Sequence, residues 1–110
     1  MLPPKINHLV AQAFDTAASA VSPESGRELV KKLDLTVVEE FNHPFEPQGF
    51  TQVFVLAESH LAIHAWPELG YLHFDLVTSS PESISADTFK SVISEIYQPQ
   101  TIKVSVVNYE

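Results

Sequence analysis

The residues best suited to chemistry lie close together in this chain, between positions 58 and 68. The segment carries two carboxylates, a hydroxyl and two imidazoles, on Glu58, Ser59, His60, His64 and Glu68. An imidazole titrates near neutral pH and can move protons, and a serine hydroxyl can act as a nucleophile. The segment lies between two apolar runs, so we expect its polar groups to be held at the ends of strands.

The spacing of His60 and His64 also leaves a metal pair open as an alternative. On a helix this spacing would bring the two imidazoles together, whereas on a strand it separates them by about 13 Å at roughly 3.3 Å per residue. The alternating pattern of residues 61–65 favours a strand, so we expect no metal site. For His60, a purely structural hydrogen bond is the alternative to a role in chemistry.

Residues 58–71 resemble the signature of the short bacterial and archaeal form of S-adenosylmethionine decarboxylase. The family pattern is close to ESHxxIHxWPExGY, and this chain reads ESHLAIHAWPELGY. The likeness extends upstream through Gly49 and Thr51, and more weakly to residues 7–11. So many fixed positions without a gap are far more specific than an isolated catalytic triplet.

The resemblance implies a proenzyme that cuts its own chain. The hydroxyl of Ser59 would attack the carbonyl of Glu58 and turn the peptide into an ester, and elimination would leave a pyruvoyl group at the new amino terminus. This covalently bound cofactor, formed from Ser59, would make a Schiff base with the substrate amine and accept the electrons of decarboxylation. The implied activity is decarboxylation of S-adenosylmethionine, which supplies the aminopropyl donor for polyamine (spermidine) synthesis.

The resemblance also assigns roles to other residues by position. His64 would act in self-processing, assisted by the hydroxyl of Thr51, where the family has serine. Phe45 would contact the adenine and sulfonium of the substrate, although Pro44 stands where the family usually has a basic residue. Glu68 would bind the ribose hydroxyls, or it could instead cap a turn.

The chain departs from the family at the residue expected to return a proton to the substrate. The family has cysteine there, whereas residues 75–79 of this chain read DLVTS and no cysteine occurs anywhere. A thiol has a pKa near 8.5, and a serine hydroxyl is a far weaker acid. Ser79 could still donate the proton with a bound water, another group such as His73 could do so, or this decarboxylation could be lost.

Two other functions therefore stay open. The same pyruvoyl chemistry could act on another amino acid, such as arginine or ornithine, although Phe45 and Glu68 favour the nucleoside substrate. Alternatively, an unprocessed homologue could act as a ligand-binding or regulatory partner.

Composition excludes several classes of function. The 110 residues fit one domain, 1–110, and a hydrophobic content of 45% is enough for one core. The net charge of −8 argues against a nucleic-acid partner; it suits a cationic substrate or simply keeps the protein soluble. The absence of cysteine rules out disulfides, thiolate zinc sites and thiol catalysis. With no signal-peptide pattern and no long apolar run, we expect a cytoplasmic protein without a membrane partner.

Strands and helices can be predicted from the same periodicities. Two Ser-Pro-Glu-Ser sequences predict helix starts, with one helix at 23–33 burying Leu29, Val30 and Leu33, and a second ending at Tyr97 before Pro99. Alternation predicts six extended runs, at 6–14, 35–41, 50–57, 59–66, 71–77 and 101–109.

These elements predict an α+β fold, a two-layer sandwich with one largely antiparallel sheet and both helices on one face. The other face of the sheet would then need cover. Because the resembled family works as a homodimer, we expect two copies to pack through these faces.

Overall fold

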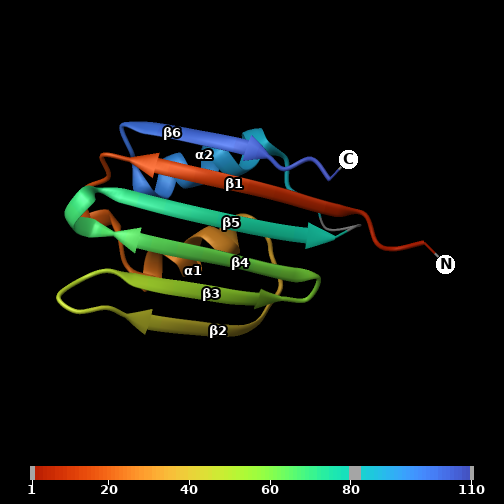
Figure 1. Cartoon of the computed structure of the whole chain (residues 1–110), viewed down its shortest axis with the longest axis horizontal. Helices are drawn as coiled ribbons and strands as arrows, with labels where there is room; N and C mark the ends of the chain where they lie inside the picture. Colours follow the sequence, from red (N-terminus) through yellow and green to blue (C-terminus); the bar gives the residue numbers. More distant parts are fainter. Residues whose placement is uncertain (1, 80–82, 110) are drawn as a thin grey trace.

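The predicted two-layer arrangement is confirmed by the computed structural model, which describes residues 2–79 and 83–109 (Figure 1). A six-stranded sheet has the order β2-β3-β4-β5-β1-β6, and each neighbouring pair of strands is antiparallel. The two α-helices lie against one face of this sheet. The elements are β1 (Ile6–Phe14), η1 (Ala18–Ala20), α1 (Pro23–Lys32), β2 (Val37–Pro44), β3 (Phe50–Leu56), β4 (Ser59–Trp66), η2 (Pro67–Leu69), β5 (Tyr71–Ser79), α2 (Ala86–Tyr97) and β6 (Thr101–Val106).

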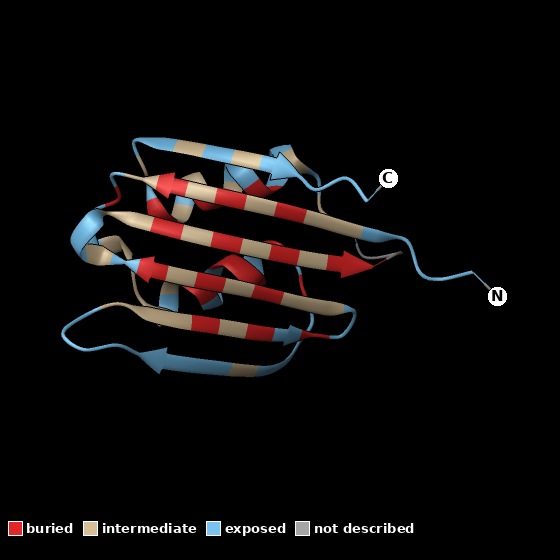
Figure 2. Cartoon of the chain, viewed as in Figure 1, coloured by how far each residue is buried: buried red, intermediate tan, exposed pale blue. Residues whose placement is uncertain are grey.

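The core lies between the helices and the four inner strands, along which buried residues alternate with less buried ones (Figure 2). Phe74 on β5 contacts Phe89 and Tyr97 of α2 edge to face, with ring centroids 6.2 and 5.2 Å apart. Such pairs add to the large apolar area that aromatic side chains bury. This contact therefore holds α2 on the centre of the sheet.

The second face of the sheet, which we call the open face, carries no helix (Figure 1). Residues opposite one another on paired strands share a face, and one such row runs from His43 through Thr51 and His64 to His73. A second row joins His60 to His8 through Val77. Along each inner strand, the residues of these rows alternate with residues that are buried in the core. The open face thus carries all the histidines of the chain, which are His8, His43, His60, His64 and His73.

Strand ends differ from the prediction where pairing continues past a sequence signal. β2 was predicted over 35–41, but it begins at Val37 and ends at Pro44, because Pro44 pairs with Phe50 and so continues the ladder. β5 runs two residues further than predicted, to Ser79. β6 was predicted to reach Tyr109, but it pairs with β1 only as far as Val106.

The helix starts follow local capping chemistry. The side chain of Ser22 accepts a hydrogen bond from the Ser25 backbone N–H, and Pro23 is the first residue of α1, as predicted. The start of α2 was predicted at the second Ser-Pro-Glu-Ser sequence, which was wrong, since the N-cap is Ser85. Residues 83–85 are not helical, so α2 begins only at Ala86. Residues 80–82 of that sequence lie outside the described part of the chain.

Gly26 lets α1 pack closely against the side chain of Gln52 on the sheet. A Cβ at this position would lie 1.9 Å from Oε1 of Gln52, which is fully buried on β3. The Gln52 Nε2 donates hydrogen bonds to the Pro23 carbonyl oxygen at 3.0 Å and to Glu40 Oε2 at 3.1 Å. A hydrogen bond from Arg27 lowers the pKa of Glu40 to about 2, so this acceptor is ionised at neutral pH.

We expect Gly26→Ala to lower the free energy of unfolding by about 2 kcal/mol. In an ordinary helix, alanine is instead more stabilising than glycine by about 1 kcal/mol. The added methyl group must displace a buried, hydrogen-bonded amide. Urea denaturation followed by circular dichroism measures the change. Lys31→Ala, at an exposed position of the same helix, is the control and should change stability by less than about 0.5 kcal/mol. Equal stability of Gly26→Ala and wild type would contradict this account.

Candidate active site

Ser59 follows a tight hairpin loop that joins β3 to β4. Leu56 pairs with Ser59, so the loop consists of Ala57 and Glu58. Two-residue hairpin loops usually place positive φ angles within the loop. Here the positive value, 156°, falls on Ser59 instead, a backbone angle that L-residues rarely adopt. The strained backbone therefore directly follows the peptide bond between Glu58 and Ser59.

The carbonyl group of that peptide bond has a hydroxyl donor beside it. Ser79, buried at the end of β5, donates from Oγ to the Glu58 carbonyl oxygen at 3.1 Å, and its Oγ also lies 3.2 Å from Glu58 Oε2. One hydroxyl proton serves one acceptor at a time, so the two oxygens share this donor. A donor on a carbonyl oxygen polarises the carbonyl carbon and favours nucleophilic attack on it.

His60 also lies at this end of β4, in a group of side chains on the open face. Its Nδ1 is 3.4 Å from Ser59 Oγ, and its Nε2 is 3.4 Å from Asp75 Oδ2. The second oxygen of Asp75 is 2.6 Å from His8 Nε2. Sequence reasoning gave no role to Asp75 or His8. Only the pairing of β1, β4 and β5 brings these three residues together, although their separate strands could be predicted.

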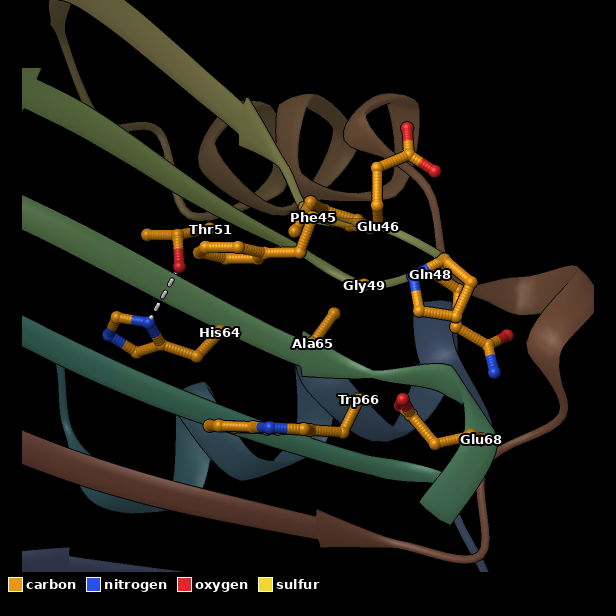
Figure 3. Close-up of a pocket in the computed structure, with 11 residues that line it drawn as sticks. Phe45, Glu46, Gln48, Gly49, Thr51, His64, Ala65, Trp66 and Glu68 are labelled. Atoms are coloured by element: carbon orange, nitrogen blue, oxygen red, sulfur yellow. Dashed lines mark hydrogen bonds between the residues drawn. The ribbon is translucent and has the colours of Figure 1, made fainter.

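A second group of predicted residues lies at the opposite end of β4, around a cleft of about 460 Å³ (Figure 3). Thr51 Oγ1 is 3.1 Å from His64 Nδ1. Partial burial, and then the nearby charge of His73, lower the pKa of His64, against a smaller opposite effect of Asp75. His64 is therefore neutral at neutral pH and can accept a proton.

The walls of the cleft combine aromatic rings with a carboxylate. Phe45, Trp66 and Glu68 line it together with Thr51 and His64 (Figure 3). The ring of His43 packs edge to face on Phe45, with centroids 4.9 Å apart, and so supports the aromatic wall. Aromatic faces beside a carboxylate suit a cationic ligand that carries a planar ring. Trp66 had no predicted role, although it stands in the motif.

The predicted site residues therefore form two groups rather than one. Ser59 and His64 lie on one straight strand five residues apart, a separation of about 16 Å at roughly 3.3 Å per residue. The first group is Glu58, Ser59 and Ser79, and the second is Phe45, Thr51, His64 and Glu68. Within one chain, His64 does not reach the peptide bond that it is predicted to help cleave.

The strand prediction for His60 and His64 is confirmed, because both lie on β4. Among the residues that the structure describes, no three side chains of the metal-binding types are grouped closely enough to hold an ion. None of the helices in residues 2–79 and 83–109 is long and apolar enough to cross a membrane.

Comparison with known proteins gives one consistent result. The family model described as S-adenosylmethionine decarboxylase matches residues 7–109. An S-adenosylmethionine decarboxylase proenzyme from Methanococcus vannielii is 35% identical over 102 residues, which cover 88% of this chain and 83% of that protein. A protein with the same name from Archaeoglobus fulgidus is 29% identical over 106 residues, covering 92% and 94%.

A solved structure agrees with these sequence relatives. The crystal structure of the adenosylmethionine decarboxylase from Aquifex aeolicus matches with a TM-score of 0.78 and 30% sequence identity. The match covers 99% of this chain and 98% of that one. The similarity therefore extends over the whole sheet and both helices.

Proposed function

This chain belongs to the S-adenosylmethionine decarboxylase family, and we propose that it is a proenzyme that cuts itself between Glu58 and Ser59 and then decarboxylates S-adenosylmethionine. The product is the aminopropyl donor for polyamine synthesis. The observation that carries the self-cleavage is the hydrogen bond from Ser79 to the Glu58 carbonyl oxygen, next to the strained Ser59. A cytoplasmic location, predicted from the sequence, is part of this proposal.

Self-cleavage begins with attack of Ser59 Oγ on the carbonyl carbon of Glu58. The new C–O bond forms, the peptide C–N bond breaks, and the hydroxyl proton ends on the freed nitrogen. Negative charge develops on the Glu58 carbonyl oxygen during this step, and the Ser79 hydroxyl stabilises it through its hydrogen bond. Release of the unfavourable φ angle at Ser59 favours the same direction.

Elimination completes the cut. A base removes the Cα proton of residue 59, the Cβ–Oγ bond of that residue breaks, and Glu58 leaves as a carboxylate that retains Oγ. Water then replaces the nitrogen, which departs as ammonia, and a pyruvoyl group remains. We assign the base to His64, because its lowered pKa keeps the imidazole neutral and Thr51 Oγ1 lies at hydrogen-bond distance from Nδ1.

The residues around position 59 fit a pyruvoyl group. When bound to substrate amine, this group supplies an electron-accepting carbonyl for the loss of CO2. Ser79 Oγ contacts the carbonyl oxygen and Oε2 of Glu58 before cleavage, so departure of Glu58 leaves this hydroxyl available close to the new amino terminus. We assign to Ser79 the return of a proton to the substrate.

Two copies are needed to bring His64 to the cleavage site. His64 and His60 both lie on the open face, Ser59 Oγ is 3.4 Å from His60 Nδ1, and no helix covers this face (Figure 1). In a two-fold dimer through this face, each contact occurs twice with the roles exchanged. With the β4 strands antiparallel, His64 of the partner subunit lies near Ser59 of the first. We propose such a homodimer, with two shared sites.

The cleft around Phe45 then serves as the substrate site. The aromatic walls attract the sulfonium and stack on the adenine, and Glu68 accepts hydrogen bonds from the ribose hydroxyls. This assignment favours S-adenosylmethionine over arginine or ornithine, which carry no nucleoside for Trp66 and Phe45 to contact.

We expect the purified chain of 12.2 kDa to cut itself into fragments of 58 and 52 residues, the second with a blocked amino terminus. Ser59→Ala should stay whole, since it lacks the attacking oxygen. Intact-mass spectrometry during incubation at neutral pH measures both proteins. A wild-type chain that remains whole after long incubation would favour the alternative of an unprocessed binding protein.

Mixed dimers test whether the site is shared. Ser59→Ala and His64→Ala chains should each be cut poorly alone. After co-refolding, the mixed dimer contains one complete site, so the His64→Ala chain should be cut and the Ser59→Ala chain should not. Mass spectrometry distinguishes the two chains. No gain in cleavage on mixing, with mixed dimers shown by native mass spectrometry, would mean that the site is not shared.

We expect Ser79→Cys to raise the turnover of S-adenosylmethionine by one to two orders of magnitude, because a thiol is a much stronger acid than a hydroxyl. The assay is CO2 release from carboxyl-labelled substrate, with rates expressed per pyruvoyl group. Arginine and ornithine are run beside it. An unchanged rate, with either amino acid turned over faster than S-adenosylmethionine, would assign the enzyme a different substrate.

A further inference from the structure

We infer that His60 is the base that takes the proton from Ser59 Oγ when the hydroxyl attacks Glu58, and that Asp75 and His8 position it. This inference rests on the proposed self-cleavage and concerns its first step. It gives the two steps different histidines, with His60 for ester formation and His64 for elimination.

The imidazole of His60 lies beside the attacking atom. Its Nδ1 is 3.4 Å from Ser59 Oγ within the same chain. His64 of that chain lies about 16 Å from Ser59 along β4. Distances between catalytic groups are often long before reaction and shorten as the reacting geometry forms. His60 therefore needs no partner subunit to accept the hydroxyl proton.

Asp75 fixes which nitrogen of His60 is free to act as a base. A carboxylate only accepts hydrogen bonds, so the contact between His60 Nε2 and Asp75 Oδ2 requires the proton on Nε2. In the neutral ring Nδ1 then carries a lone pair, which faces Ser59 Oγ. Serine, imidazole and carboxylate thus stand in the order that activates a hydroxyl nucleophile.

His8 holds the carboxylate of Asp75 in turn. His8 Nε2 is 2.6 Å from Asp75 Oδ1, and His8 Nδ1 is 3.0 Å from the hydroxyl of Tyr109. Partial burial acts to raise the pKa of Asp75, but the hydrogen bonds and charges of His8 and then His60 outweigh it, and the pKa lies below its usual value. Asp75 is therefore ionised at neutral pH and can stabilise a protonated His60.

The proton that leaves Ser59 Oγ is transferred within this group of residues. His60 Nδ1 takes the proton as the bond between Ser59 Oγ and the Glu58 carbonyl carbon forms, while Asp75 balances the charge on the ring. The same proton passes to the nitrogen of residue 59 as the C–N bond breaks. No oxidant, metal or external acid is consumed, and the product is the ester on which His64 acts.

The two steps can be separated in the His64→Ala background, where the ester should accumulate. Hydroxylamine cuts esters but not peptides under mild conditions, so it should release a fragment of 58 residues from His64→Ala. Adding His60→Ala should slow ester formation about 100-fold, the usual effect of a general base. Added imidazole should restore part of the rate, which it would not do if His60 served only the fold.

Further variants test the positioning residues and the fold. Asp75→Asn should slow ester formation by at least tenfold, and Asp75→Glu should retain more of the rate than Asp75→Asn. His60→Gln repeats the test if His60→Ala does not fold, as judged by circular dichroism. Val55→Thr alters the cross-strand neighbour of His60 without removing any of these contacts, and should form ester within about twofold of the parent rate.

The outcomes separate this inference from the proposed function. Ester formation at the parent rate in folded His60→Ala and His60→Gln would overturn the role of His60 and leave self-cleavage intact. Equal rates in Asp75→Asn and the parent would overturn the positioning role of Asp75. A wild-type chain that never cuts itself, with no hydroxylamine-sensitive ester in His64→Ala, would overturn both the proposed function and this inference.

Discussion

The register of β4 between β3 and β5 is the constraint on which the site depends. Leu61 and Ile63 are fully buried beneath the sheet, and the residues between them and beside them face the other way. A slip of one residue would turn His60 and His64 into the core and expose both apolar side chains. Burial of an aliphatic side chain is worth about 1.5–3 kcal/mol, so core packing fixes the positions of His60 and His64 as well as the fold.

The sequence was sufficient to predict β4, the presence of two helices and the two-layer fold, since these follow from local periodicity. The roles of the residues in the two groups come from one contiguous motif and stay predictions. The sequence could not predict contacts set by pairing between distant strands. The hydrogen bond from Ser79 to Glu58 joins positions 21 residues apart in the sequence, and the contact between Asp75 and His8 joins positions 67 residues apart. The same limitation explains why the end of β2 was misplaced, because it depends on where β2 stops pairing with β3.

Serine at position 79 bears differently on the two reactions proposed for the site, self-cleavage and decarboxylation. A hydroxyl is a stronger hydrogen-bond donor than a thiol but a much weaker acid. Ser79 is therefore well suited to stabilise the Glu58 carbonyl oxygen, where it already donates, and poorly suited to protonate carbon. In the proposed mechanism, serine at this position would thus favour maturation while limiting turnover, because both proposed tasks fall on the same buried side chain.

The order of strands determines what would hold the protein together after the proposed cleavage. A cut after Glu58 would divide the sheet into a fragment with β1, β2 and β3 and another with β4, β5 and β6. In the sheet, β1 lies between β5 and β6, and β3 lies beside β4, so the two fragments interleave. Neither can depart without breaking three ladders of backbone hydrogen bonds. The proposed mature protomer would thus be an interlocked pair of two different fragments, and its refolding after denaturation would be a second-order reaction that slows on dilution.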